Sequence, residues 1–270
     1  MRRISGIAFA VVVYVNLARF LAPWISLPIS STVALTLATV VFAVLHAAGL
    51  LGGRSAAVFF ALSAGVSWAF EELGVATGLI YGRYHYTDLL GPKLGHVPLL
   101  IPLAWFAMIY PSYLIATVLT EGRLRPARWG AARLAWRAAI AGLVMTAWDV
   151  VIDPGMAAPG GSWVWEEGGP YFGVPLQNFA GWLLTTGAVY LLFGWWDGRE
   201  ARRSPAAAGE TAAPPLGFAA MPLFMYALMA LRYVVTNDRG VLGVVALFAM
   251  GVPVLVALGH ILDPPREPGS

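Results

Sequence analysis

The chain has 270 residues, of which 59% are hydrophobic and only 11% are charged. Because soluble domains carry roughly 25% charged residues, this composition excludes an ordinary soluble protein. It predicts an integral membrane protein with a single membrane domain over residues 1–270. The net charge of +3 comes from arginines in the predicted loops, which is typical of membrane orientation and not of nucleic-acid binding. Cysteine is absent, which excludes disulfides, thiolate catalysis and cysteine-ligated metal sites.

The hydropathy pattern predicts an all-α bundle of about eight transmembrane helices, since about 20 apolar residues cross a bilayer core. The expected spans lie at about residues 4–23, 30–51, 55–80, 97–120, 131–152, 173–196, 216–236 and 240–262. A short turn at residues 237–240 is all that separates the last two, so seven is the alternative count. The first span follows a basic start but no small-residue cleavage site, so we expect an uncleaved helix. The Ala/Pro-rich segment 198–216 is predicted to be a flexible cytoplasmic linker.

Basic residues fall mainly in alternate loops, and this bias sets the expected orientation. With the N-terminus inside, the cytoplasmic segments hold Arg2, Arg3, Arg54, Arg123, Arg125, Arg128, Arg133, Arg199, Arg202, Arg203 and Arg266. The opposite side holds only Arg83, Lys93, Arg232 and Arg239. Both termini are therefore predicted to be cytoplasmic, in a bacterial cytoplasmic membrane. The third, fifth and sixth spans would then bring their polar ends together on the far side.

Two glutamates, Glu71 and Glu72, close the apolar run of the third span. A carboxylate that faces lipid is costly, so at least one should point into the bundle. Glu71 and Gly74 share a helical face, where a small residue allows a helix or a ligand to come close. The functional interpretation is a proton donor or a stabiliser of a cation. The alternative is a buried carboxylate paired with Arg83 or Arg137.

Aromatic and polar residues alternate in the segment 81–88, which follows the third span. This alternation indicates an extended segment over the mouth of a pocket, although aromatic residues are also enriched at membrane interfaces. His85 and His96 are candidate metal ligands. The chain has only four histidines, without the clustered spacing of membrane di-iron enzymes, so we predict no metal site.

Asp149 and Asp153 are spaced i, i+4 and lie on one helix face. One interpretation is a Mg²⁺–diphosphate site, since hard cations favour carboxylate oxygens. The favoured one is that the two share a proton, because close carboxyl groups do not both ionise cheaply, and one keeps its proton near neutral pH. For Asp153 alone, the alternative is that Pro154 simply ends the helix there.

Aromatic residues surround these carboxylates. They form either an interface belt or the wall of a pocket that suits a carbocation, because aromatic faces attract positive charge. Asn178 and Gln177 are candidates to position a water. No dinucleotide, phosphate-loop, haem-attachment or nucleophile-elbow motif is present, so no nucleotide or redox cofactor is predicted. The aromatic residues concerned are Trp148, Trp163, Trp165, Tyr171, Phe172, Phe179 and Trp182.

Four ordered motifs resemble the carotenoid biosynthesis membrane proteins of the 1′,2′-hydratase family, which includes archaeal bisanhydrobacterioruberin hydratases. The motifs are EELGVATGLIYGRYHYTDLLGPKLGHVPLLIPLAW (71–105), WDVVIDP (148–154), WVW (163–165) and YFGVPLQNFAGW (171–182). The resemblance covers residues 55–196, while the outer spans match only in being hydrophobic. Tyr81 stands where members of the family often carry Phe, a departure at the predicted rim of the pocket.

The resemblance implies addition of water across the terminal C1′=C2′ bond of an acyclic carotenoid, without a cofactor. We expect Asp149 or Asp153 to protonate the alkene and Glu71 to act as partner or base, with water capturing the cation. Expected partners are the polyene, membrane lipid and other enzymes of carotenoid synthesis. The residues expected to contact substrate are Glu72, Tyr81, Tyr84, Tyr86, Trp105, Trp148, Trp163, Trp165, Tyr171, Asn178 and Trp182.

Two other functions are compatible with the same residues. One is an isoprenoid cyclase or isomerase, in which an alkene and not water captures the cation. The other is a non-catalytic carotenoid or lipid carrier, which has no need for inward carboxylates. A prenyl-transferring enzyme would require Mg²⁺.

Overall fold

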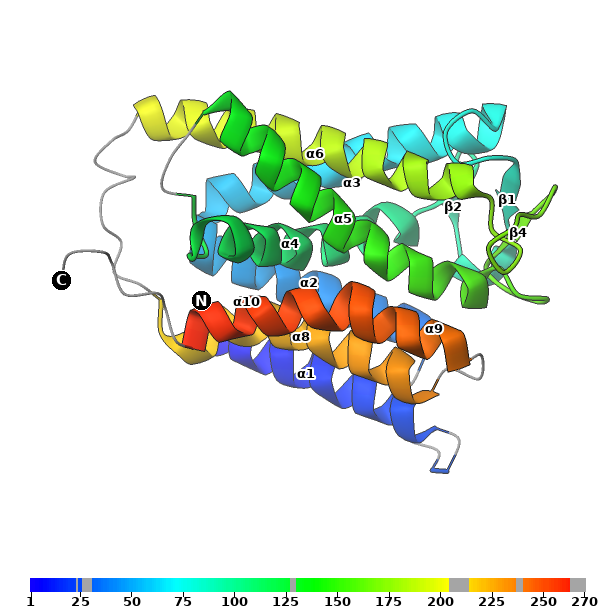
Figure 1. Ribbon diagram of the computed structural model, residues 1–270, viewed down its shortest axis with the longest axis horizontal. Helices are drawn as coiled ribbons and strands as arrows, with labels where there is room; N and C mark the ends of the chain where they lie inside the picture. Colours follow the sequence, from blue (N-terminus) through cyan, green and yellow to red (C-terminus); the bar gives the residue numbers. More distant parts are fainter. Residues whose placement is uncertain (23, 26–30, 127–129, 204–213, 237–239, 263–270) are drawn as a thin grey trace.

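Helix α4 (Leu100–Glu121) is the centre of the bundle (Figure 1). Every residue from 105 to 118 is buried, as expected for a helix that is apolar on all sides. Helices α2 (Thr32–Leu51), α3 (Gly53–Thr77) and α5 (Ala131–Met156) pack directly against it, as do two helices from the end of the chain. The carboxylate-bearing spans are therefore held against one rigid centre.

The computed structural model describes residues 1–22, 24–25, 31–126, 130–203, 214–236 and 240–262. Within these ranges eight helices are long and apolar enough to cross a membrane, which confirms the predicted all-α bundle. The remaining spans are α1 (Arg2–Leu21), α6 (Leu176–Arg203), α8 (Leu216–Thr236) and a last span at Gly240–Leu262. That last span consists of α9 (Gly240–Val245), the π-helical turn η2 (Ala246–Gly251) and α10 (Val252–Leu262).

Helix α6 continues further than the composition of the chain indicated. It ends at Arg203, so the predicted linker at 198–216 starts with helical residues. An ion pair of 2.5 Å between Arg54 and Glu200 ties this last part of α6 to the start of α3. The rest of the predicted linker, at 204–213, and most of the turn at 237–240 lie outside the described residues, as do Arg128, Arg239 and Arg266.

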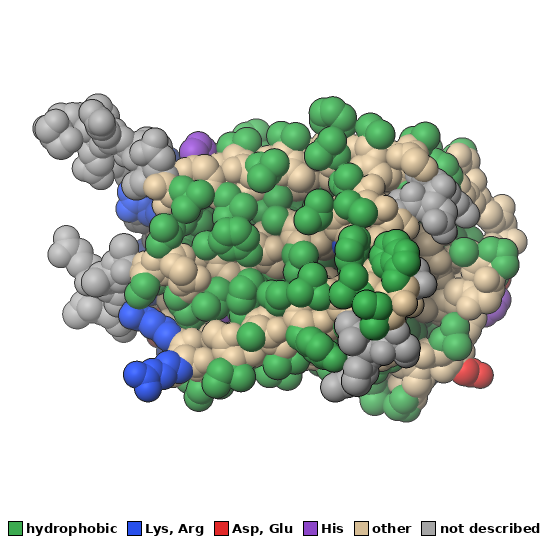
Figure 2. Space-filling model, turned by 90° about the horizontal axis from the view of Figure 1, so that it is seen from below, with side chains coloured by type: hydrophobic (Ala, Val, Ile, Leu, Met, Phe, Trp, Pro, Cys, Tyr) green, Lys and Arg blue, Asp and Glu red, His purple; other side chains and the backbone are tan. Residues whose placement is uncertain are grey.

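The two ends of the bundle differ in charge and structure. The N-terminus and the described arginines of the predicted cytoplasmic segments lie at one end, and the short strands lie at the other (Figure 1). Figure 2 shows basic side chains at one end, an acidic side chain at the other, and mostly hydrophobic side chains along the face between them. This distribution agrees with a bundle that crosses a membrane along its long axis.

Among the described residues, four short strands close the end opposite the arginines of the predicted cytoplasmic segments. Strand β1 (Tyr84–Tyr86) pairs antiparallel with β4 (Trp163–Trp165), so that Tyr84 lies opposite Trp165 and Tyr86 opposite Trp163. A one-turn helix η1 (Asp88–Leu90) leads to a hairpin of β2 (Lys93–Leu94) and β3 (Val97–Pro98). Of the extended segment predicted at 81–88, residues 84–86 form a strand, β1, in the loop between α3 and α4.

Helix α8 is tied to the centre of the bundle by a buried histidine. Pro222 has no N–H, so the carbonyl of Phe218, four residues earlier, lacks its helical donor. His46 of α2 supplies the missing bond through Nε2, at 2.8 Å from that oxygen. Its Nδ1 lies 2.6 Å from the hydroxyl of Tyr110 in α4, so one imidazole joins three helices.

Helices α3 and α6 approach each other around the ring of Tyr81. A Cβ atom added at Gly74 would lie 2.6 Å from this ring, and one added at Gly181 would lie 2.5 Å from it. The Tyr81 hydroxyl lies 2.7 Å from the hydroxyl of Thr185, one turn further along α6. The small face predicted from Glu71 and Gly74 therefore accommodates an aromatic side chain of the protein itself.

We predict that Gly181→Ala destabilises the protein by about 1–3 kcal/mol, because the new methyl group overlaps the Tyr81 ring and the Ile80 carbonyl. The matched control is Gly187→Ala on the same helix, where an added Cβ meets nothing within 4 Å. That variant should unfold at the same temperature as the wild type or slightly higher, since Ala favours helix. Thermal unfolding in detergent measures both. Equal unfolding temperatures for the two variants would contradict the predicted contact.

Candidate active site

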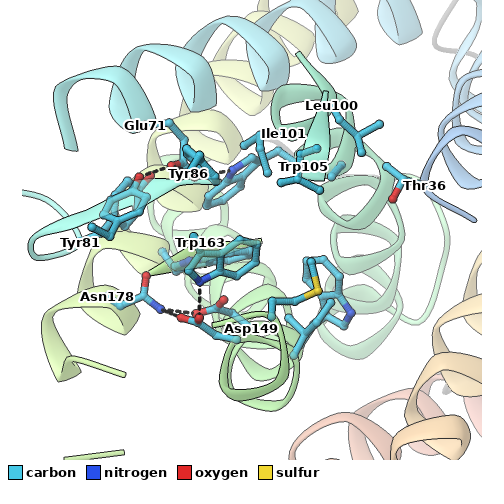
Figure 3. Close-up of a pocket in the computed structure, with 18 of the residues that line it drawn as sticks. Thr36, Glu71, Tyr81, Tyr86, Leu100, Ile101, Trp105, Asp149, Trp163 and Asn178 are labelled. Carbon is cyan, nitrogen blue, oxygen red and sulfur yellow. Dashed lines mark hydrogen bonds between the residues drawn. The ribbon is translucent and has the colours of Figure 1, made fainter. Parts of the chain in front are cut away.

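A cavity of about 100 Å³ lies at the strand-bearing end, between α3, α4, α5, α6 and the β1–β4 pair (Figure 3). Most of its wall is aromatic or aliphatic, and its polar groups are carboxylates, tyrosine hydroxyls and one amide. The structure brings together here most of the residues that the sequence singled out. They are Glu71, Tyr81, Tyr84, Tyr86, Trp105, Trp148, Asp149, Asp153, Trp163, Trp165, Asn178 and Trp182.

Glu71 is buried on one side of the cavity and is held by three uncharged donors. The hydroxyls of Tyr84 and Tyr86 both donate to Oε2, the second at 2.7 Å, and Nε1 of Trp105 donates to Oε1 at 2.9 Å. Hydrogen bonds donated to a carboxylate stabilise its charged form. Burial, and next the nearby Glu71 carboxylate, raises the pKa of both tyrosines well above its ordinary value, so their hydroxyls keep the protons they donate.

The strand register explains how two tyrosines reach one carboxylate. Side chains alternate between the two faces of a strand, so Tyr84 and Tyr86 point inward while His85 points outward. His85 lies 3.2 Å from Glu166 on the outer surface. The alternation noted in the sequence at 81–88 therefore separates an inner face that contacts Glu71 from an outer face that is exposed.

Asp149 lies on the opposite side of the cavity from Glu71 (Figure 3), and Asp153 lines the same cavity. The side-chain amide of Asn178, in the first turn of α6, donates to Oδ2 of both, at 2.7 Å to Asp149 and 2.8 Å to Asp153. Both aspartates are about 1% exposed. Asn178 thus bridges the two aspartates. The sequence had suggested this residue only as one that positions a water.

The two aspartates differ in how many donors they meet. Oδ1 of Asp153 accepts hydrogen bonds from the indoles of Trp163 at 2.6 Å and Trp165 at 3.2 Å, in addition to the Asn178 bond to Oδ2. Oδ1 of Asp149 is buried and has no hydrogen-bond partner among the described residues. The donors therefore favour a charged Asp153, while Asp149 has an oxygen free to carry a proton.

Helix α5 does not end at Asp153, contrary to the alternative drawn from Pro154. The helix continues to Met156, and Asp153 points into the cavity from its last turn. Pro154 removes the helical hydrogen bond to the carbonyl of Val150, four residues earlier, but the chain stays helical to Met156. The pairing of Glu71 with an arginine is likewise wrong. Arg83 pairs with Glu167 on the surface and Arg137 with Glu121 in the bundle.

Glu72 and Tyr171 were expected to contact substrate but lie outside the cavity wall. Glu72 follows Glu71 by one residue, a rotation of about 100° on a helix, and turns away to accept hydrogen bonds from the backbone and ring of His96. Tyr171 packs against Phe172 and Phe179 near the start of α6. Both residues were expected at the site because they are close in sequence to residues that line it, and closeness in sequence did not bring their side chains to the cavity.

Several wall residues were missed at the sequence level. Ile152 and Met156 share the helix face of Asp149 by their spacing, a signal that was available. Thr32 and Thr36 come from α2, far from any acidic motif, and their own sequence gives no such signal. In the described part of the chain, no group of three or more His, Asp and Glu residues is arranged to hold a metal ion.

Comparison with known proteins gives two matches that agree with each other. A family described as "carotenoid biosynthesis protein" matches residues 30–213. A bisanhydrobacterioruberin hydratase from the archaeon Haloarcula japonica is 39% identical over 128 residues, which cover 47% of this chain and 41% of the relative. The match thus spans about two fifths of that relative's length.

No solved structure matches the chain. The family match includes both glutamates, the aspartate pair, both strands that close the cavity and all of α6. It also extends over well over half of the sequence. The chain therefore belongs to the carotenoid biosynthesis protein family.

Proposed function

We propose that the protein is a carotenoid hydratase that adds water to the terminal C1′=C2′ bond of an acyclic carotenoid. One observation carries this proposal. A buried carboxyl oxygen of Asp149, which has no hydrogen-bond partner among the described residues, borders an aromatic cavity that also contains Glu71, with donors on both of its oxygens. Protonating a trisubstituted alkene requires a strong acid shielded from bulk water, and stabilising the carbocation that forms requires nearby negative charge. The family and the named hydratase relative support the substrate class.

In this mechanism Asp149 is the general acid. Its Oδ1–H gives the proton to C2′, and the alkene electron pair forms the new C–H bond, leaving a tertiary cation at C1′. Asn178 holds Oδ2 of Asp149 and ties it to Asp153, which keeps the acid in one orientation. Asp153 accepts three hydrogen bonds and therefore carries the negative charge of the pair.

Glu71 and the indole rings stabilise the cation. Glu71 is held as a carboxylate by its three donors, and its charge acts in a site from which bulk water is excluded. Trp105 stacks on Trp182 with centroids 4.1 Å apart, and Trp148 meets Trp182 edge to face. Such rings offer negative faces to a carbocation.

Water completes the addition. It attacks C1′, its oxygen forms the C–O bond of a tertiary alcohol, and its released proton returns to the Asp149 carboxylate. The balance is one water consumed per bond, with no electron acceptor or donor required. A cyclase or isomerase would use the same acid but would quench the cation without adding an oxygen, and a carrier would leave the polyene unchanged.

We propose that the basic end of the bundle faces the cytoplasm, as its excess of arginines favours, and that the cavity lies near the opposite membrane surface. We expect the protein in the bacterial cytoplasmic membrane. A hydrophobic polyene would then reach the cavity from the lipid phase. Other enzymes of carotenoid synthesis would act on the same substrate in the same membrane.

Expression in a lycopene-producing bacterium tests the reaction directly. Extracted pigments should gain the mass of one water per modified end, and growth in ¹⁸O-labelled water should place the label in the product. A product of unchanged mass with altered absorbance would indicate cyclisation or isomerisation. Pigment bound by the purified protein and released unchanged would identify a carrier. Either of these results rejects the hydratase.

Asp149→Asn should lower the rate of hydration by a factor of about 10²–10⁴, the usual contribution of a general acid. The change retains the shape of the side chain but removes the transferable proton. Asp88→Asn is the control, since Asp88 is exposed at the same end and pairs only with Lys93 among the described residues. The rate of pigment hydration by each variant, measured in detergent or in membranes, gives the comparison. Normal turnover by Asp149→Asn removes Asp149 from the role of acid.

Glu71→Gln should lower the rate by about 10²–10³, because it removes the negative charge that faces the cation. The matched control is Glu72→Gln, one residue away on the same helix and outside the cavity, which should keep near-normal activity. Pigment binding by both variants should remain, as the aromatic wall is unchanged. If the two variants lost activity equally, a general effect on α3 and not the charge of Glu71 would be responsible.

A further inference from the structure

A second cavity, of about 270 Å³, adjoins the first between α1, α2, α4, α5 and α8. The two share part of their walls, so only a few side chains separate them. The shared residues are Thr32, Thr36, Ala104, Trp148, Ile152 and Met156. The proposed reaction uses the first cavity only, which leaves the second without a role.

The second cavity differs from the first in its charge. Two arginines, Arg19 of α1 and Arg232 of α8, line it, and none of the described residues in its wall is acidic. Arg19 donates from Nη1 to the hydroxyl of Thr32 at 2.9 Å. The guanidinium of Arg232 lies over the ring of Tyr233, 4.8 Å from its centroid. Positive charge thus converges from two helices on one space.

One of these arginines has a donor to spare. Nε of Arg232 is buried and makes no hydrogen bond with any described residue. A buried donor without a partner costs free energy comparable to a lost hydrogen bond, and the cost is higher for a charged group. Two guanidinium groups on one cavity also repel each other. An anion in the cavity would relieve both costs.

We propose that the second cavity binds a phosphate group, held by Arg19 and Arg232. Guanidinium groups bind phosphate through paired N–H donors, and the Thr32 hydroxyl is placed to add another hydrogen bond. The site is at the level of helix ends, since α1 ends at Leu21, α2 begins at Thr32 and α8 ends at Thr236. Lipid phosphates lie at the corresponding depth of a membrane.

The deeper wall of this cavity is apolar and suits the chain attached to a lipid phosphate. It is formed by Leu35, Ala107, Met108 and Met229. Methionine side chains adapt to irregular apolar ligands. Free inorganic phosphate has the same recognition chemistry without this apolar part, so the two sources are distinguished by experiment.

A bound phosphate would also benefit the proposed reaction, and this step rests on the proposed function. A carbocation in the first cavity is destabilised by positive charge in the adjoining space, because Coulomb interactions are strong where water is excluded. An anion between Arg19 and Arg232 neutralises that charge. The binding itself does not depend on the hydratase assignment.

Native mass spectrometry of the full-length protein, released from detergent, tests the site. Wild-type protein is supplied with phosphatidylglycerol or with phosphatidylcholine. In both cases one lipid should stay bound when the complex is activated by collisions in the spectrometer. Arg232→Gln and Arg19→Gln should each weaken retention about tenfold, the usual effect of losing a charge-assisted hydrogen bond. Arg83→Gln is the matched control, since Arg83 lies at the same end but pairs with exposed Glu167, and it should retain lipid as the wild type does.

The companion measurement is thermal unfolding with added inorganic phosphate. Stabilisation by lipid alone identifies a lipid site, and stabilisation by inorganic phosphate as well identifies a general phosphate site; both support the proposal. Arg232→Lys keeps the charge without the fork of donors and should fall between wild type and Arg232→Gln. If wild type and both glutamine variants retain lipid equally, or Arg83→Gln loses as much, the proposal is overturned. These outcomes do not require any hydratase activity.

Discussion

The protein depends on one arrangement, in which three carboxylates are held inside an apolar bundle by uncharged donors. Tyrosines and an indole donate to Glu71, two indoles donate to Asp153, and one amide donates to both aspartates. Arg83 and Arg137 pair with other glutamates. A guanidinium at the site would neutralise the negative charge that stabilises the cation in the proposed reaction. Neutral donors fix the geometry and leave the charge available. The rest of the structure serves to bring these donors to the carboxylates.

The donors come from segments that would be unstable alone. Strands β1 and β4 have three residues each and form a sheet of only two strands, which has little stability by itself in water. Their inward side chains are anchored by hydrogen bonds to Glu71 of α3 and Asp153 of α5. The carboxylates and the strands therefore stabilise one another: the helices order the loops, and the loops supply the polar partners that make buried acids tolerable.

Much of this was predictable from the sequence, and the errors have physical causes. Hydropathy predicted the spans because the bilayer imposes their length, and the spacing of Asp149 and Asp153 placed both on one face. The long motifs indicated the family. Glu72 was expected at the site together with Glu71, because pattern alone does not say which side of α3 faces α4. The contributions of Thr32 and Thr36 depend on packing between distant helices, which no local pattern encodes. Helix α6 continues to Arg203, and its last part is joined to α3 by the Arg54–Glu200 ion pair, a contact between distant segments that no local pattern encodes.

The pairing of β1 with β4 constrains how related chains can change. Adding or deleting one residue just before either strand would turn its inner side chains to the outer surface, because successive residues face opposite ways. Length changes in the connections should therefore be tolerated only where the backbone can absorb them away from the paired segment. Substitutions should be tolerated unequally within each strand. His85 and Val164, the middle residues, face outward and should accept other side chains, while the inward aromatic residues on either side of each should not. Related sequences should therefore show constant and variable positions that alternate along both strands.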